Sequence, residues 1–378
     1  MRRPAQFSSR RPLTWLIGLL LVSTAAGTLP PGVSDARQQR QHTRPRQVGG
    51  GPAPAQTPAT ARTDDAGAEQ SVGDDEVVKV ESLEVLLPVT VRDASGALVK
   101  DLDRSAFRVY EDGSEQPLSE LKARQVPADV ALLVDSSSST SDNFEDFRRA
   151  SLDFAAQLGA EDRVCLVKFD DRVELLQDWT QSRAQLRRSL GRLSPGMFTR
   201  FNDALYLTAR EQMRPTPSRR RALVILTDGI DSGRGTAAAP ALKALLESQA
   251  AVYVISNTEI ARRRKQAELD TLLTGDASAV NFNSLRIGDL REGLRVLDAS
   301  EKNLALLCST TGGRLYRPES FDALGELYRA IAEELRHQYA LYYRPLNKAR
   351  DGSFRRVRVE TSAPGLQVTA RAGYYAPR

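Results

Sequence analysis

Two apolar runs in this chain end in an aspartate, and a run of hydroxyl side chains follows the first of them. The runs are "ALLVD", which ends at Asp135, and "VILTD", which ends at Asp228. In the stretch Asp135-x-Ser137-x-Ser139, alternate side chains point to one side of the loop, so a carboxylate and two hydroxyls converge. These are hard oxygen ligands without thiolate or imidazole, a set that favours Mg²⁺, Mn²⁺ or Ca²⁺.

Strands and helices alternate around these runs. Continuous apolar segments such as "DVALLVD", "RVCLVKF", "RALVILT" and "AVYVIS" are typical of strands buried on both faces, and helical stretches separate them. The alternation predicts an α/β fold with a doubly wound, mainly parallel sheet, in which "VELLQDW" is an edge strand. Ligands bind such sheets beyond the carboxyl ends of the strands, and a buried acid there is costly unless it is paired or holds a cation.

The combination resembles the von Willebrand factor A (VWFA) domain and its metal-ion-dependent adhesion site (MIDAS). That family's motif is D-x-S-x-S, then a threonine in a loop before a helix, then an aspartate after the fourth strand. Matching pieces occur here in this order across residues 126–335, in a Rossmann-like α/β frame. The metal positions that the resemblance implies are Asp135, Ser137, Ser139, Thr199 and Asp228.

In this family the serines and the threonine typically contact the ion directly, while the aspartates often act through water. The resemblance therefore implies Mg²⁺ (or Mn²⁺ or Ca²⁺) as cofactor, and a protein ligand whose acidic residue completes the ion's shell. One departure is the loop "GMFT", in which Met197 and Phe198 stand where Gly-Gly-Thr is common, so loop position or partner choice is expected to differ. Asp142 lies where integrin β-type A domains place an acid for a second ion, although a helix-capping acid fits that position at least as well. Ser136 and Ser138 are expected to be incidental.

The segments that flank the predicted A domain have β character. "FRVYEDGSEQPLSELKAR" predicts two strands around an Asp112-Gly113 turn, and "FRRVRVETS" and "LQVTARAGYY" predict further strands near the C-terminus. Both flanks are similar to a bacterial group of exported VWFA-related proteins.

We expect the two flanks to form one small β-sandwich, because the N-terminal unit is too small for a core of its own. The A domain (126–337) would then be inserted between an N-terminal β unit (76–125) and C-terminal strands (338–378). Deleting residues 345–378 should unfold the N-terminal strands if this holds.

The segment Phe321–Gln338 is strongly amphipathic, with Leu324, Leu327, Ile331 and Leu335 on one stripe. By analogy with integrin-type A domains, this last helix is expected to couple the metal site to the sandwich. Residues 257–300 are less regular, and their basic cluster Arg262–Lys265 is expected to be a solvated helix face.

The N-terminus indicates export. Basic residues precede "LTWLIGLLLVSTAAG", so residues 1–27 are expected to be a cleaved signal peptide or an uncleaved N-terminal anchor. Residues 28–75 have the composition of a disordered linker. The protein is thus expected in the periplasm, on the cell surface or in the medium, without other membrane contact. Residues 1–50 hold eight Arg and one acid, so the rest of the chain is slightly acidic although the total is +5, and nucleic-acid binding is not indicated.

Two other functions and one covalent feature remain as alternatives. His42 and His337 are the only histidines, which argues against nucleophilic catalysis and favours a non-enzyme. A Mg²⁺-dependent phosphatase of the haloacid dehalogenase type needs an acid where Ser137 stands. An A domain without metal, acting as a scaffold, is the other alternative. Cys165 and Cys308 could form a disulfide bond or remain buried thiols, because the sequence does not give the distance between them.

Overall fold

The computed structural model describes residues 83–123, 126–137, 144–214, 219–231, 235–274 and 277–378. The predicted signal or anchor, the linker, and the residues Ser138, Ser139 and Asp142 lie outside these ranges. No helix in the described part of the chain combines the length and apolar character needed to cross a bilayer.

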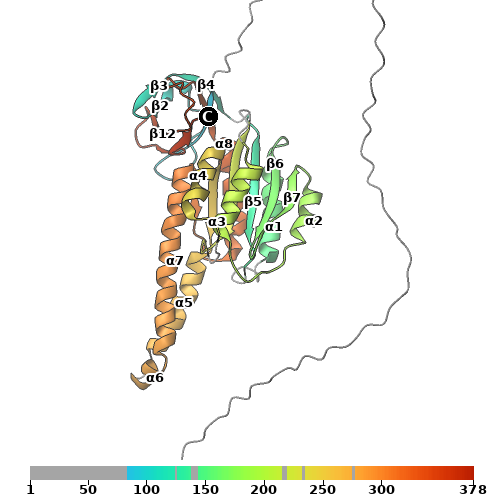
Figure 1. The fold of residues 1–378 in the computed structure, drawn as a ribbon, viewed down its shortest axis with the longest axis vertical. Helices are drawn as coiled ribbons and strands as arrows, with labels where there is room; N and C mark the ends of the chain where they lie inside the picture. The colour runs from blue at the N-terminus through green and yellow to red at the C-terminus, as the bar shows by residue number, and fades with distance from the viewer. Residues whose placement is uncertain (1–82, 124–125, 138–143, 215–218, 232–234, 275–276) are drawn as a thin grey trace, which may run out of the picture. The chain divides into compact units, whose positions relative to one another are not determined.

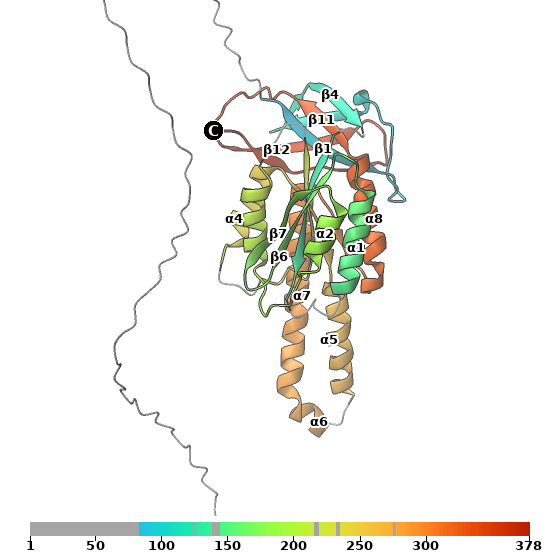
Figure 2. The same ribbon diagram turned by 90° about the vertical axis from the view of Figure 1, so that its right-hand side faces the viewer.

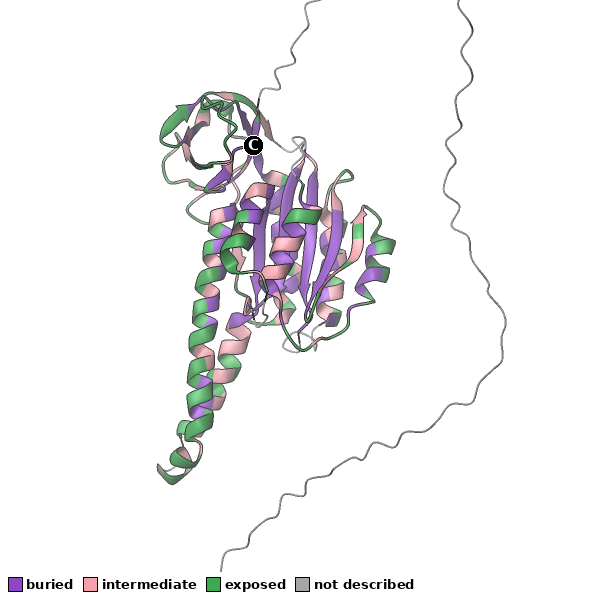
Figure 3. Ribbon diagram, in the orientation of Figure 1, coloured by how far each residue is buried: buried purple, intermediate pink, exposed green. Residues whose placement is uncertain are grey.

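Six strands form the central sheet, in the order β10-β9-β8-β5-β6-β7 (Figure 1). The strands are β5 (Ala128–Asp135), β6 (Arg163–Phe169), β7 (Val173–Thr180), β8 (Arg220–Thr227), β9 (Ala251–Ser256) and β10 (Leu315–Tyr316). All pairings are parallel except that of the edge strand β7 with β6. Every residue of the neighbouring strands β5 and β8 is buried (Figure 3). Because these two strands are parallel and paired, their carboxyl ends lie together at one edge of the sheet.

Helices cover both faces of this sheet. They are α1 (Phe144–Gln157), α2 (Arg183–Leu190), α3 (Phe201–Leu207), α4 (Ala238–Ser248) and α8 (Leu324–His337), together with the long α7 (Ser284–Thr311). Side chains alternate along β5: Leu132 packs in a core with α1, α2 and α8, whereas Leu133 packs in a second core with α3, α4 and α7. Figure 2 shows α1 and α8 side by side on one side of the sheet and α4 on the other. The predicted doubly wound fold is confirmed.

The flanking strands form two four-stranded antiparallel sheets, ordered β13-β1-β11-β4 and β14-β12-β2-β3. The strands are β1 (Val85–Arg92), β2 (Phe107–Glu111), β3 (Ser114–Gln116), β4 (Leu118–Ala123), β11 (Tyr339–Tyr343), β12 (Phe354–Thr361), β13 (Gln367–Thr369) and β14 (Gly373–Tyr375). N-terminal β1 pairs with C-terminal β11 and β13, and β2 pairs with β12. Leu87, Val109, Leu341 and Val357 share one core. A sandwich built from both ends of the described chain is therefore confirmed as part of the fold.

The predicted turn at Asp112-Gly113 joins β2 to β3, with φ of 48° and 88°. The expectation of two strands here was incomplete, because a third strand, β4, follows Pro117. Proline lacks a backbone N–H and interrupts the ladder. The chain changes sheets at this point, since β3 and β4 belong to different sheets.

The expectation that residues 257–300 are less regular was wrong. The chain forms a helical hairpin from α5 (Thr258–Leu273), the short α6 (Ala277–Phe282) and α7, and α5 and α7 run side by side beyond the sheet (Figures 1 and 2). Between them Leu269, Ile287 and Leu290 form a small apolar cluster. A helix that packs against a single neighbour buries only a narrow stripe, so its sequence lacks the wide apolar face that marks a core helix.

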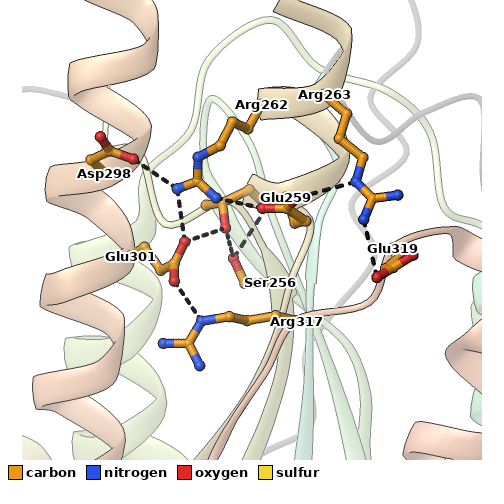
Figure 4. A network of polar contacts seen from close by, with 9 residues as sticks. Ser256, Glu259, Arg262, Arg263, Asp298, Glu301, Arg317 and Glu319 are labelled. Carbon is orange, nitrogen blue, oxygen red and sulfur yellow. Dashed lines mark hydrogen bonds and ion pairs between the residues drawn. The ribbon is translucent and has the colours of Figure 1, made fainter. Parts of the chain in front are cut away.

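Ion pairs join α5 and α7 near the sheet (Figure 4). The Arg262 guanidinium contacts Glu259 (2.5 Å), Asp298 (2.8 Å) and Glu301 (2.9 Å), and Glu301 also pairs with Arg317. The basic cluster is thus not simply a solvated face, because Arg262 is engaged by three carboxylates.

The C-terminal helix α8 joins the sheet to the sandwich through a buried carboxylate. Glu334 accepts hydrogen bonds from Thr90 Oγ1 (3.2 Å), Arg92 (2.5 Å) and the Tyr253 hydroxyl (3.2 Å). Thr90 and Arg92 lie on β1 of the sandwich and Tyr253 lies on β9 of the central sheet, so the Glu334 side chain contacts both. Movement of α8 in response to the metal site stays a prediction.

The two cysteines are free and buried. Cys165 on β6 and Cys308 on α7 lie in the same core cluster. Burial raises the pKa of the Cys308 thiol to about 12 and that of Cys165 further, so both are neutral core side chains at physiological pH.

Candidate metal-binding site

Asp135 is the last residue of β5, and its side chain is fully buried. One carboxylate oxygen accepts a hydrogen bond from Thr227 Oγ1 at 2.7 Å, and the other accepts one from the Ser137 backbone N–H at 3.0 Å. The second contact closes an Asx turn, which directs the chain out of the strand. Thr227 ends β8, so the hydrogen bond between the two strands fixes the orientation of the carboxylate.

A second carboxylate lies close enough to affect the titration of Asp135. Burial raises the pKa of Asp135 to about 6, and the negative charge of Asp228 raises it as well, against the opposing hydrogen bonds from Ser137 and Thr227. Two acids that repel each other in a buried place are stabilised by a divalent cation.

Asp228 follows β8 and begins a tight loop. Its carboxylate accepts the Ile230 N–H at 3.0 Å, and its carbonyl accepts the Ser300 hydroxyl at 2.6 Å. Gly229 has φ of +70°, and a Cβ there would lie 2.7 Å from the Leu304 side chain. Ser300 and Leu304 both belong to α7, so this helix supports the Asp228 loop at two points one turn apart.

Thr199 is buried in the loop that precedes α3. Gly196 donates to the Ser136 carbonyl at 2.8 Å, which ties this loop to the one after β5. Arg200 donates its N–H to the Asp170 carbonyl at 3.2 Å, which ties the loop to the end of β6. Thr199 therefore lies between two residues, Gly196 and Arg200, whose hydrogen bonds fix the loop to the ends of β5 and β6.

A third contact joins the start of α3 to the Asp228 loop. The Asn202 N–H donates to the Asp231 carboxylate at 2.8 Å. The loops after β5 and β8 and the loop before α3 thus form one hydrogen-bonded unit at the carboxyl edge of the sheet.

Residues 130–230 match the family model described as von Willebrand factor type A domain. This chain contains a von Willebrand factor type A domain. The match spans the strands and loops that carry Asp135, Thr199 and Asp228. No match to a curated protein sequence was found.

Several solved structures resemble the A domain at low identity. A von Willebrand factor type A protein from Catenulispora acidiphila is 12% identical, with 79% of this chain and 75% of that chain covered and a TM-score of 0.42. The vWF domain of the type V pili tip protein Mfa5 from Porphyromonas gingivalis is 13% identical, with 56% and 95% covered and a TM-score of 0.36. Proximal thread matrix protein 1 from the mussel byssus, described with a zinc-occupied MIDAS motif, is 14% identical, with 60% of this chain and 49% of that chain covered and a TM-score of 0.39. The chain therefore spans about half of the mussel protein.

The A domain brings together the sequence-predicted residues that the structure describes. Asp135, Ser137, Thr199 and Asp228 are all buried at the carboxyl edge, and Ser139 lies outside the described residues. No cluster of three or more His, Cys, Asp or Glu side chains suited to a metal occurs within the described ranges. The oxygen atoms that these four residues offer, from carboxylates and hydroxyls, are of the kind that fits Mg²⁺ or Mn²⁺.

Ser136 was expected to be incidental to ion binding, and its contacts here are made by its main chain rather than by its hydroxyl. It is fully buried, its N–H donates to the Phe169 carbonyl at 2.9 Å, and its own carbonyl accepts from Gly196. Met197 and Phe198, by contrast, are 77% and 56% exposed on the A domain surface beside Thr199.

Sequence reasoning missed several supporting residues of the A domain site. Asp231 carried a signal, since it stands in "TDGID" three residues after Asp228. Thr227, Asp170 and Ser300 carried none that could be recognised, because their roles depend on contacts between segments far apart in the chain.

Proposed function

We propose that this chain is an exported protein-binding module whose A domain holds one divalent cation, Mg²⁺ or Mn²⁺, and receives a carboxylate from a protein partner. The observation that carries the proposal is the buried pair Asp135 and Asp228 beside the Ser137 hydroxyl, with Thr199 buried in a loop that is tied to the same edge of the sheet. Ser139 is proposed as the fifth position from the sequence motif alone. The ion would supply positive charge for the partner's carboxylate.

The chain's own residues would position the ion and limit access to it. Asp135 and Asp228 would balance its charge, while the hydrogen bonds from Thr227 and Ile230 hold the two carboxylates in place. The hydroxyls of Ser137 and Thr199 are neutral, so a partner's carboxylate would enter the ion's shell as a further hard oxygen ligand.

Binding is proposed rather than catalysis. The one histidine among the described residues, His337, ends α8 beside Arg220, at the amino ends of the strands and away from Asp135. General-base chemistry by imidazole therefore has no described group at the metal site.

Capture of partners from envelope extracts of the source organism tests this function. Immobilised wild-type protein in Mg²⁺ should retain a partner that is lost in EDTA and with Asp135→Ala. Asp146→Ala, a change at a partly exposed position of α1 that pairs with Arg149, should retain the partner and serves as control. Retention that is equal in Mg²⁺, in EDTA and with Asp135→Ala would contradict the proposal and favour a metal-free scaffold.

A further inference from the structure

An apolar groove of about 490 Å³ lies between α3, α4 and α7, next to the Asp228 loop. Buried apolar side chains contribute to its lining, among them Phe201, Leu205, Leu304 and Leu307. The two helices α3 and α4 and the upper part of α7 lie on the same face of the sheet (Figure 1).

The wall that α7 contributes is open to solvent. Leu306 is 61% exposed and Val296 is 39% exposed, and Ala299 between them is exposed as well. Apolar side chains of this size left in water on a recessed surface mark a binding site more often than a solvated face.

The groove is continuous with the proposed metal site. Gly229, Ile230 and Asp231, which directly follow Asp228, form one end of it, and Asn202, three residues after Thr199, lines it too. Ser300 lines the groove and also donates its hydroxyl to the Asp228 carbonyl at 2.6 Å. A chain bound at the metal would therefore pass over the mouth of the groove.

We propose that the groove receives an apolar side chain of the same protein partner whose carboxylate meets the ion. This inference rests on the proposed function and adds a second determinant to it. Ile230 is two residues from Asp228, a span of about 7 Å at most, so the apolar residue would lie about two or three positions from the partner's acid. Leucine, isoleucine, methionine or phenylalanine would fit an aliphatic groove of this size, and the partner motif would combine one acid with one such residue.

Selection from a library of displayed twelve-residue peptides tests the motif. The probe is the library itself, panned on Mg²⁺-loaded wild-type protein and on Ala299→Trp, which fills the groove from an exposed position of α7. Ala156→Trp on α1 is the matched control, because α1 covers the opposite face of the sheet.

The wild-type protein should enrich peptides with Asp or Glu within two or three residues of a large apolar residue, in Mg²⁺ only. Peptides selected on Ala299→Trp should still contain the acid but show no preference for a neighbouring apolar residue. A peptide selected on the wild-type protein should bind Ala299→Trp at least tenfold more weakly, whereas Ala156→Trp should behave as wild type. Enrichment of acids without a neighbouring apolar residue would overturn the groove proposal and leave the metal function standing. Enrichment that ignores Mg²⁺ and acids would overturn the proposed function itself. A wild-type dimer that Ala299→Trp dissociates would show that a second copy occupies the groove, which also overturns the proposal.

Discussion

At the scale of single residues, the loop that carries Thr199 depends on a close contact at Gly196. A Cβ at this position would lie 2.5 Å from the Cβ of Asp170, and Asp170 cannot easily retreat because it forms a buried ion pair with Lys168 at 2.7 Å. The Gly196 N–H also holds the Ser136 carbonyl. Any side chain here must therefore displace the Thr199 loop or the Asp170 turn.

Gly196→Ala should lower the free energy of unfolding by about 1–3 kcal/mol, the usual cost of overpacking, and weaken divalent-ion binding about tenfold or more. Chemical denaturation and calorimetric titration measure the two effects. Gly288→Ala is the control, since a Cβ on this helical glycine meets no atom within 4 Å and alanine favours a helix. Unchanged ion affinity in Gly196→Ala would show that Thr199 does not contribute as proposed.

The titration of Asp135 predicts how stability of the metal-free protein depends on pH. Its pKa is about 6 in the folded chain against 3.8 for the ordinary group, so the folded chain favours the protonated carboxyl. The stability that this protonated form contributes is full below about pH 4 and is lost as the pH rises through 6. In EDTA, wild-type protein should gain about 1 kcal/mol relative to Asp135→Asn when the pH falls from 7.5 to 5. Urea unfolding of both proteins at the two pH values measures this difference. Parallel pH profiles would show that Asp135 ionises normally.

The positions of Asp135 and Asp228 could be predicted because each ends a run of strand residues, and parallel strands bring their carboxyl ends to one edge. Ser137 followed from its alternate spacing after Asp135, and Thr199 from the family resemblance. Gly196 and Ser300 could not be assigned roles from sequence. The role of Gly196 depends on its close approach to Asp170, and that of Ser300 on its contact with the Asp228 carbonyl, which is far away in the chain.

At the scale of elements, the α5–α7 hairpin is held near the sheet by charge rather than by a wide apolar face. Arg262 is central to this contact, and its hydrogen bond, with that of Arg263, lowers the pKa of Glu259. The pair of Arg262 with Glu259 is therefore formed at neutral pH and weakens as the pH falls through the lowered pKa of Glu259.

Arg262→Leu should loosen the base of the hairpin. Amide hydrogens of α5 should exchange about tenfold faster, because hydrogen bonds to three carboxylates are lost from a partly buried position. Hydrogen-exchange mass spectrometry measures this locally. Arg295→Leu, which removes a single exposed ion pair with Glu292, should change little. Equal exchange in both variants would show that the network does not secure the hairpin.

The sequence signal for this hairpin was weak for a physical reason. The helix α8 was predicted because Leu324, Ile331 and Leu335 form a wide stripe that packs on the sheet. In α5, only Thr258 and Leu269 are buried, so polar residues on most sides conceal the helical period.

At the scale of the described chain, the sandwich depends on strands from both flanks of the A domain. The sequence predicted that strands of the two flanks pair, because a β unit of about fifty residues cannot bury a core alone. In the structure β1 pairs with β11 and β13, and β2 pairs with β12. The register, the change of sheet at Pro117 and the buried Arg355–Glu111 pair could not be predicted, since nothing local encodes them.

Deleting residues 345–378 removes β12, β13 and β14. We expect β2 and β3 to lose hydrogen-exchange protection, because β2 loses its partner β12 and Glu111 loses Arg355 in a buried place. The strands β5 and β8 should stay protected, since their neighbours remain. Protection of β2 equal to that in the full chain would contradict the shared-sandwich account.

The central claim is that the A domain holds a divalent cation through its strand-end carboxylates. Calorimetric titration of Mg²⁺ or Mn²⁺ into the full chain tests it most directly. The account predicts binding of one ion per chain to the wild-type protein, no binding to Asp135→Ala, and wild-type binding to Gly288→Ala. Absence of binding heat in the wild-type protein with both ions, at several temperatures, would contradict the claim.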